Sequence, residues 1–353
     1  MDARYKRTSL FRRIEKVTIH PKVASHFDMS SKTNNVVPPG KVAFVTGANG
    51  ISGHAFIEHL IRTPESKWSK IIVTSRRPLL SSWLDPRVEF VALDFLEPAE
   101  NIVIVIKTVC KDVTHTYFTS YVHSMDFSTL AEKNCPLFRN FLDAVDSACP
   151  KLERIRLQTG GKHYNVIRPM GIIGYTPQFN GMNEVIPLAQ YFLICRELGE
   201  TPKWPGNLRN YHRVEDQSYA PSIADLTVWA TTQEHCKDEA FNHTNGDVIF
   251  YSSMPDREQR ELDLVEWSRD KEEVWKSIVA KYGGRADCFQ TEGFAMLNWG
   301  FNSSITSTTP FMSTVAKARK FGWTRIEDSY EAYDRSFKSY ENAGILPCSR
   351  QFQ

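Results

Sequence analysis

Long hydrophobic runs are missing from this chain of 353 residues. The longest unbroken aliphatic stretch, residues 102–106, is far shorter than the ~18 residues of a helix that spans a bilayer, so we expect no membrane partner. The first forty residues also lack the apolar core of a secretory signal. The seven cysteines are an odd number, widely spaced and without a Cys-x-x-Cys motif. This usage is typical of reduced thiols and predicts a cytoplasmic protein.

The chain lacks a strong excess of charge of either sign, except in its first forty residues, which are basic. The formal net charge is +2, yet residues 1–40 hold eight Lys/Arg against three Asp/Glu. The rest of the chain is therefore slightly acidic and gives no electrostatic reason to expect a nucleic-acid partner. We interpret residues 1–40 as a basic, flexible extension. The alternative is an import sequence, since apolar residues at helical spacing stand between its arginines.

Two catalytic patterns are absent as well. No Gly-x-Ser-x-Gly motif occurs, which argues against a hydrolase with a nucleophile elbow. The ten histidines show no metal-ligand spacing, so we predict no metal site.

What the chain does carry, from Lys41 onward, is an alternation of short runs rich in β-branched residues with longer amphipathic stretches. The predicted strands are 42–46, 71–75, 88–93, 113–119 and 155–159, and the predicted helices between them are 54–62 and 127–147. Strands that alternate with helices form a parallel sheet covered on both faces. The sequence therefore predicts an α/β fold with a Rossmann-type doubly wound parallel sheet.

A glycine-rich turn follows the first predicted strand and opens a helix. Its sequence is Gly47-Ala48-Asn49-Gly50-Ile51-Ser52-Gly53. Glycine is needed where the backbone takes angles closed to other residues, and where a phosphate approaches the N–H groups of a helix N-terminus. The position between a strand and a helix predicts a dinucleotide site. The alternative is a tight turn with no ligand.

Two arginines, Arg76 and Arg77, stand at the end of the second predicted strand, where an NAD enzyme carries an acidic residue for the ribose diol. A guanidinium suits a 2′-phosphate, so the sequence favours NADPH as the cofactor. The alternative is a pair of solvated arginines. Asp94, which ends the third predicted strand, is expected to face the adenine edge.

The character of the chain changes after Gly174. Residues 185–198 and 272–282 are helical patterns that end at glycines, and aromatic residues become frequent. We predict three parts: the extension 1–40, an NADP-binding Rossmann domain at 41–180, and a mixed, mainly helical substrate lobe at 181–353 that partly threads back to the sheet. The aromatic content of this lobe suggests an apolar substrate.

Four segments carry a family resemblance. They are 117–121 (Tyr-Phe-Thr-Ser-Tyr), 157–164 (Leu-Gln-Thr-Gly-Gly-Lys-His-Tyr), 168–175 (Arg-Pro-Met-Gly-Ile-Ile-Gly-Tyr) and 240–248 (Ala-Phe-Asn-His-Thr-Asn-Gly-Asp-Val). Through them the chain resembles the progesterone 5β-reductase/iridoid synthase-like family of short-chain dehydrogenase/reductases, in particular fungal members found in secondary-metabolite pathways. The resemblance implies an NADP-dependent oxidoreductase that reduces an enone C=C or a carbonyl group.

The same resemblance implies the site residues. Lys162 falls on the family's catalytic lysine, whose ammonium would stabilise the negative charge that forms on the substrate oxygen. NADP contacts, together with the turn glycines Gly47 and Gly53, fall on Asn49, Gly50, Ile51, Arg76, Arg77, Asp94, Phe95, Thr119, Gln158 and Ile172.

One segment of the family pattern is missing. Family members carry several tens of residues, including a helix and the catalytic tyrosine, where Tyr164 is followed here at once by Asn165. None of the thirteen tyrosines forms a Tyr-x-x-x-Lys pair, which also argues against a nucleotide-sugar epimerase or dehydratase. If 155–159 and 166–170 are neighbouring parallel strands, the six residues between them span ~20 Å at most. That is too short for the usual crossover helix.

We therefore interpret the chain as an NADPH-dependent reductase of a small apolar molecule, in mycotoxin-like secondary metabolism. The alternatives are an NADPH-binding pseudoenzyme and a truncated gene product. In an active chain the proton comes from Tyr117, Tyr121, Tyr164 or water, which makes Tyr164 a candidate catalytic residue beside Lys162. We expect low activity, greater with enones than with ketones, because solvent can protonate an enolate. A homodimer is compatible with the sequence.

Overall fold

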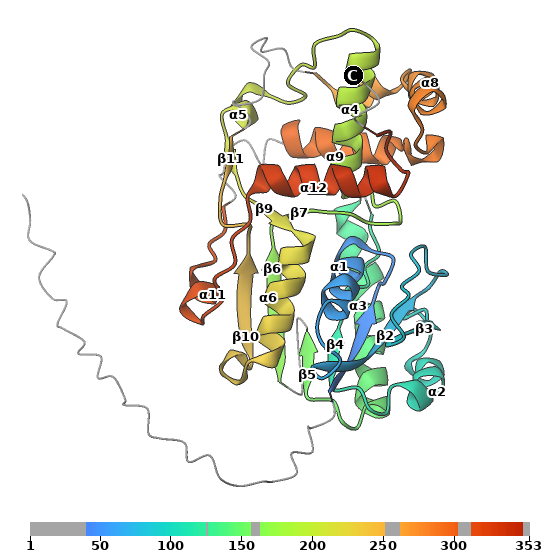
Figure 1. Ribbon diagram of the computed structural model, residues 1–353, viewed down its shortest axis with the longest axis vertical. Coiled ribbons are helices and arrows are strands. Elements are labelled where there is room, and N and C mark those ends of the chain that lie inside the picture. Colours follow the sequence, from blue (N-terminus) through green and yellow to red (C-terminus); the bar gives the residue numbers. More distant parts are fainter. Residues whose placement is uncertain (1–39, 125, 157–162, 251–261, 303–311, 349–353) are drawn as a thin grey trace, which may run out of the picture. The chain divides into compact units, whose positions relative to one another are not determined.

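The computed structural model describes residues 40–124, 126–156, 163–250, 262–302 and 312–348, all of which fall in one compact unit. Its centre is a seven-stranded sheet in which every pair of neighbours is parallel (Figure 1). The strand order is β10-β6-β5-β4-β1-β2-β3. The strands are β1 (Lys41–Thr46), β2 (Trp68–Ser75), β3 (Val88–Ala92), β4 (His115–Tyr117), β5 (Arg154–Arg156), β6 (Tyr164–Pro169) and β10 (Glu239–His243). The predicted Rossmann-type fold is confirmed.

Alternation along β1 explains why both faces of the sheet are covered. Val42 and Phe44 belong to one core cluster, with helices α2 (Ala99–Val109) and α3 (Leu130–Ala148). Ala43 and Val45 point to the opposite face, against α1 (Ile51–Ile61) and α6 (Ala220–Thr232). Since successive strand side chains alternate between faces, an all-apolar strand of this kind is stable only between two helical layers.

Most of the remaining elements form a helical lobe beyond the sheet, in which α12 (Ser329–Asn342) lies between the sheet and helices α4 (Val185–Glu197), α8 (Glu272–Tyr282) and α9 (Thr291–Asn302) (Figure 1). Two short helices lie apart from it, α11 against β10 and η2 against α6. Two small two-stranded sheets join in, β7 with β9 in parallel and β8 with β11 in antiparallel. The helices predicted at 185–198 and 272–282 are confirmed as α4 and α8. The elements are β7 (Gly171–Ile173), α4 (Val185–Glu197), α5 (Leu208–Tyr211), β8 (Val214–Glu215), β9 (Gln217–Tyr219), η2 (Glu234–Cys236), β11 (Ile249–Phe250), α7 (Leu264–Ser268), α8 (Glu272–Tyr282), η4 (Ala286–Cys288), α9 (Thr291–Asn302), α11 (Ala316–Lys320) and α12 (Ser329–Asn342), and η1 (Phe127–Thr129) precedes α3.

The pairing of β5 with β6 confirms that the two strands are neighbours and parallel. Within the described residues Ile155 pairs with Tyr164 and Arg156 with Asn165. The segment that connects the two strands, residues 157–162, lies outside the described residues.

The two faces of β6 are covered to different extents. Asn165 and Ile167 are buried, and Ile167 packs in a cluster with residues of α6. On the opposite face Tyr164 and Val166 are half-buried and Arg168 is exposed. A crossover helix would cover such a face in a doubly wound sheet, so the half-exposed face agrees with the segment that the sequence lacks.

Candidate functional site

The glycine turn lies at the carboxyl edge of the sheet, directly after β1. Gly47 has φ +68°, a backbone conformation that favours glycine. A Cβ atom on Gly53 would lie 2.1 Å from the carbonyl oxygen of Gly47, and one on Gly47 would lie 2.9 Å from that of Thr119. Thr119 donates its N–H to the hydroxyl of Thr46 over 3.0 Å and its own hydroxyl to the Thr46 carbonyl. The chain therefore passes too close to itself here for any side chain.

The N-terminus of α1 fits a phosphate group. Gly50 is its N-cap residue, no side chain caps the helix, and its first turn holds no acidic residue. The first N–H groups of an α-helix have no partner within the helix, and a helix N-terminus attracts anions. The shorter α7 and the long α12, in contrast, are capped by the carboxylates of Asp263 and Asp328. Since α4 (Val185–Glu197) and α6 also begin without a side-chain cap or an acidic residue in the first turn, it is the glycine turn before α1 together with its free N-terminus that marks this helix start for an external anion.

Asn49 connects the glycine turn to the segment after β2. Its amide nitrogen donates to the Ser75 hydroxyl over 3.1 Å and to the Pro78 carbonyl over 2.9 Å, and its amide oxygen accepts from the Leu80 N–H over 3.0 Å. The Asn49 side chain is buried. It therefore fixes the segment that carries Arg76 and Arg77 against the turn.

The two arginines and Asp94 lie together at this edge. Arg76 and Arg77 are exposed, and one guanidinium nitrogen of Arg76 is 4.0 Å from a carboxylate oxygen of Asp94. Asp94 follows β3 and accepts a hydrogen bond from the Leu96 N–H over 3.0 Å. Phe95 differs, because it is buried and its ring contacts the ring of Phe141 in the core behind the edge.

The lobe also reaches the glycine turn. The hydroxyl of Thr176 donates to the Asn49 carbonyl over 3.0 Å, and the Thr176 N–H donates to the hydroxyl of Tyr340 over 3.0 Å. Ile172 is half-buried in β7, and a Cβ atom on Gly174, two residues further along, would lie 3.6 Å from Cδ1 of Ile51. Sequence patterns did not indicate Thr176 or Tyr340, because their partners are far away along the chain.

The described structure does not bring the predicted catalytic residues to the glycine turn. Lys162 and Gln158 lie outside the described residues. Tyr164 begins β6 and is in register, through Ile155 and Thr116, with Phe44 in β1. That level is two residues, about 7 Å, below the end of β1. The structure therefore does not place Tyr164 with the glycine turn.

Two other tyrosines were candidates for the proton. Tyr117 is fully buried, its hydroxyl is 3.1 Å from that of Thr231, and its ring stacks on Phe56 of α1. This position rules out Tyr117 as a donor to a substrate, because the hydroxyl points into the helical layer. Tyr121 follows β4 at the carboxyl edge and is 52% exposed, and partial burial raises the pKa of its hydroxyl.

The lobe holds an acidic group that titrates near neutral pH. Burial raises the pKa of Glu184 to about 7, and the neighbouring Glu215 contributes to the rise in the same direction. Tyr333 donates its hydroxyl to Glu184 over 2.6 Å, and Arg213 pairs with Glu215 at 2.8 Å. No sequence motif indicated this group, since its members come from separate segments of the chain.

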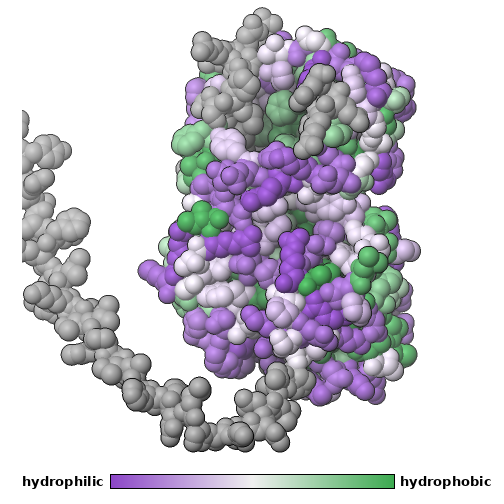
Figure 2. All heavy atoms as spheres, in the orientation of Figure 1, coloured by the Kyte–Doolittle hydropathy of each residue, from purple (hydrophilic) through white to green (hydrophobic). Residues whose placement is uncertain are grey.

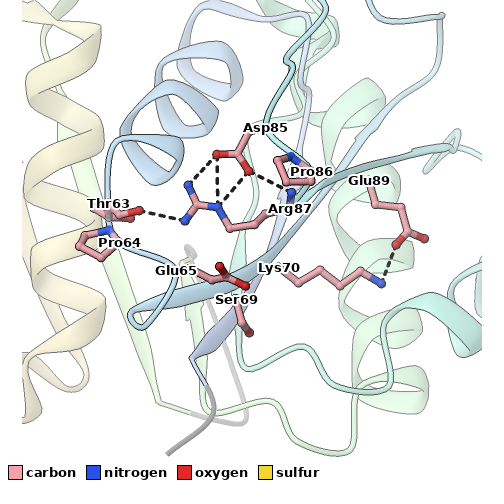
Figure 3. Close-up of a pocket in the computed structure, with 9 residues that line it drawn as sticks. All are labelled: Thr63, Pro64, Glu65, Ser69, Lys70, Asp85, Pro86, Arg87 and Glu89. Atoms are coloured by element: carbon pink, nitrogen blue, oxygen red, sulfur yellow. Dashed lines mark hydrogen bonds and ion pairs between the residues drawn. The ribbon is translucent and has the colours of Figure 1, made fainter. Parts of the chain in front are cut away.

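A hollow of about 610 Å³ lies at the other edge of the sheet, around Arg87 (Figure 3). The Arg87 guanidinium donates to both oxygens of Asp85 and to the carbonyls of Ile61, Thr63 and Trp68. Its N–H groups are thus used to hold the chain together, and they hold the pKa of Asp85 below its usual range. We assign this hollow a structural role.

Two absences apply to the described part of the chain. No group of three or more His, Cys, Asp or Glu side chains there could hold a metal ion. None of the helices in those same ranges combines the length and the apolar character of a membrane span.

Comparisons with known proteins agree with this arrangement. The family description "PRISE-like Rossmann-fold domain" matches residues 43–168. A short chain dehydrogenase, gsfE, of Penicillium aethiopicum is 37% identical over 87% of this chain and 99% of its own length. A 3-oxo-Δ4,5-steroid 5β-reductase of Arabidopsis thaliana is 24% identical over 87% of this chain and 93% of its own. An (S)-8-oxocitronellyl enol synthase of Nepeta racemosa is 26% identical over 83% and 89%.

Solved structures show the same fold. The terminal R domain of the myxalamid biosynthetic pathway superposes with a TM-score of 0.57 at 13% identity, over 87% of this chain and 92% of its own. Gre2 of Candida albicans gives 0.53 at 10% identity, over 86% and 99%.

The lengths of the compared chains also matter. The alignment with the Penicillium dehydrogenase runs over 378 residues, although this chain has only 353 residues and 87% of them take part. The relative therefore contains stretches that have no counterpart here. This finding agrees with the segment that the sequence pattern lacks.

Proposed function

The chain belongs to the short-chain dehydrogenase/reductase superfamily, in its progesterone 5β-reductase/iridoid synthase-like family, and is an oxidoreductase; from this premise we propose that it reduces an enone C=C or a carbonyl of a small apolar molecule with NADPH. The observation that carries the proposal is the uncapped N-terminus of α1 beside the two arginines after β2. The helix N-terminus suits the pyrophosphate, which NADH and NADPH both carry, and the guanidinium groups suit the 2′-phosphate, which only NADPH carries.

The residues of this chain would hold that cofactor in a specific way. The N–H groups after Gly50 would bind the pyrophosphate, and Arg76 or Arg77 would bind the 2′-phosphate. Asn49 supports this binding because it fixes the position of the arginine segment. When bound, NADPH supplies a hydride to a substrate carbon.

Lys162 is proposed to act on the substrate oxygen. Reduction of an enone or a ketone creates negative charge on that oxygen, and one well-placed donor contributes roughly 3–4 kcal/mol to stabilising it. The plant relatives are named for a 3-oxo-steroid and an 8-oxocitronellyl enol, which are small oxygenated molecules with apolar frameworks. The proposed place in secondary metabolism rests on the resemblance to fungal family members found in such pathways.

The test is NADPH oxidation with a panel of cyclic and acyclic enones and the matching ketones. We expect slow turnover, faster with enones, and none in Lys162→Ala. Tight NADPH binding by fluorescence with no oxidation of any panel member would favour a cofactor-binding pseudoenzyme. Unchanged turnover in Lys162→Ala would refute the role of the lysine.

Cofactor preference has a separate test. Arg76→Asp combined with Arg77→Asp should weaken NADPH binding at least tenfold and change NADH binding little, because only NADPH carries the 2′-phosphate. Lys107→Asp combined with Arg139→Asp, two exposed sites on α2 and α3, is the matched control for the change in charge. Equal losses for the two cofactors would contradict the assignment.

A truncated gene product is the second candidate. The half-exposed face of β6 and the unmatched stretches of the fungal relative favour it. Sequencing of the transcript decides the matter: additional codons directly after Tyr164 would identify a truncation, and their absence would establish the short β5–β6 link as native.

Location and assembly complete the proposal. Each of the seven cysteines, all within the described residues, is a free thiol, which supports action in the reducing cytoplasm. Figure 2 shows that the face drawn there is mainly hydrophilic, with hydrophobic residues in scattered patches. Sedimentation velocity measures whether a homodimer forms.

A further inference from the structure

His123 is a histidine of intermediate exposure in the segment that follows β4. Its ring nitrogens Nδ1 and Nε2 are nevertheless both shielded from solvent, and neither has a hydrogen-bond partner within the described residues. Buried polar atoms in folded proteins are nearly always hydrogen-bonded, so an exception calls for an explanation.

The backbone on both sides of His123 is held firmly. The Val122 N–H donates to the Asn134 side-chain oxygen over 2.8 Å, and the Asn134 amide donates back to the Val122 carbonyl over 2.9 Å. On the other side, the Ser124 hydroxyl is within 3.1 Å of both Thr129 and Lys133. The residues on both sides of His123 are therefore tied to α3 and to the short turn before it.

The ring lies where the carboxyl edge of the sheet meets the helical lobe. A Cβ atom built on Gly181, just before α4, would lie 3.8 Å from Cδ2 and 3.9 Å from Nε2 of His123. The same position is 3.8 Å from Cβ of Glu292 on α9. His123 thus faces the lobe and not the core of the sheet.

The ring is also close to the glycine turn along the chain. Thr119, which hydrogen-bonds to the end of β1, precedes His123 by four residues. Four residues span at most about 14 Å. A substrate that sits beside a cofactor bound at the turn and under the lobe would lie within reach of this segment.

We propose that His123 is the proton donor of the reduction and takes the place of the tyrosine that the sequence lacks. The proposal rests on the proposed function. A hydride adds to the substrate carbon, and the displaced electron pair moves to the carbonyl oxygen. The imidazolium N–H of His123 then gives its proton to that oxygen, so the substrate gains one hydride and one proton. The neutral imidazole regains its proton from water that enters the site once the product has left.

The first test is His123→Phe, which keeps the approximate size of the ring but removes both nitrogens. A donor of this kind contributes about 100-fold or more, so turnover should fall by that factor. Thermal stability should stay the same or rise, because no unpartnered polar atom is left in the site. NADPH affinity should not change. A histidine with a purely structural role would give the opposite pattern of lower stability with turnover retained.

The matched control is His235→Phe. His235 is exposed, lies in η2 just before β10 begins, and bonds to the carbonyl of Phe321. It should keep the turnover of the unmodified chain.

A second variant keeps the proposal testable if the phenylalanine does not fit. His123→Ala should have the same low turnover, and added free imidazole should restore it in part. Unchanged turnover in His123→Phe or His123→Ala overturns the proposal, as does low turnover in His123→Ala that imidazole leaves unrestored. If the unmodified chain oxidises no NADPH with any enone or ketone, the proposed function itself fails, which is a different result.

Discussion

The hydroxyl of Thr176 donates a hydrogen bond to the backbone carbonyl of Asn49 over 3.0 Å, across 127 residues of sequence. Tyr340, in the last helix of the described chain, accepts from the Thr176 N–H and from the side chain of Asn183. The glycine turn is thus supported from the lobe as well as from the sheet. A substitution in the lobe that breaks this link should therefore change the affinity for the cofactor.

Thr176→Val tests this link. The methyl group fills the space of the hydroxyl but leaves the buried Asn49 carbonyl without its partner, which should cost about 1–2 kcal/mol of unfolding free energy. NADPH affinity should fall several-fold, because the turn loses its support from one side. Thr176→Ser keeps the hydroxyl and is the control. Equal NADPH affinity in the valine and serine variants would show that the link does not act on the turn.

Gly53→Ala tests the geometry of the turn itself. The new methyl group would lie 2.1 Å from the Gly47 carbonyl oxygen, so the turn must open. Overpacking of this kind costs about 1–3 kcal/mol, and we expect NADPH binding to weaken at least tenfold. Gly300→Ala is the control, since a Cβ added there has no described residue within 4 Å beyond its own helix and chain neighbours, and alanine is favoured in a helix such as α9. Binding unaffected by Gly53→Ala would disprove the assignment of the turn as the phosphate site.

Tyr117→Phe tests whether the Tyr117 hydroxyl contributes to stability or to turnover. The hydroxyl contacts the helical layer through Thr231, so its loss should cost about 1 kcal/mol of stability and leave turnover unchanged. Denaturant unfolding and NADPH oxidation measure the two effects. A large fall in turnover with normal stability would instead indicate that Tyr117 donates the proton.

Glu184→Gln tests the acidic group of the lobe through pH. The folded-state pKa of about 7 is above the usual value for a glutamate, so the folded protein binds more protons than the unfolded chain between about pH 4.5 and 7. The associated stability is present at low pH and is lost as pH rises through 7. The glutamine side chain does not titrate, so the variant does not lose this stability. Its free energy of unfolding, relative to that of the unmodified chain, should therefore be about 2 kcal/mol higher at pH 8 than at pH 5.

The measurement is the free energy of unfolding at both pH values. Glu132→Gln, an exposed carboxylate on α3, is the control and should show no such difference. The same pH dependence with and without Glu184 would mean that another group is responsible.

The fold followed closely from the sequence where local pattern and tertiary structure agree. The glycine turn, the buried strand before it and the helices at 185–198 and 272–282 all lie where periodicity and glycine positions put them. The strand predicted at 113–119 is shorter, at His115–Tyr117, and the one predicted at 155–159 begins one residue earlier, at Arg154, while its residues 157–159 lie outside the described part of the chain. A strand ends where its neighbour stops pairing, and no local pattern contains that information.

The sequence by itself determined the parallel sheet, the helix N-terminus left open for a phosphate and the missing tyrosine segment, because each depends on residues adjacent in the chain. The tertiary structure decided the rest. It turned Tyr117 into the core, set Tyr164 below the carboxyl edge, and placed His123 against the lobe and Thr176 against the glycine turn. These outcomes depend on contacts between residues far apart in sequence, whose free energy is gained only once the sheet and the lobe have formed.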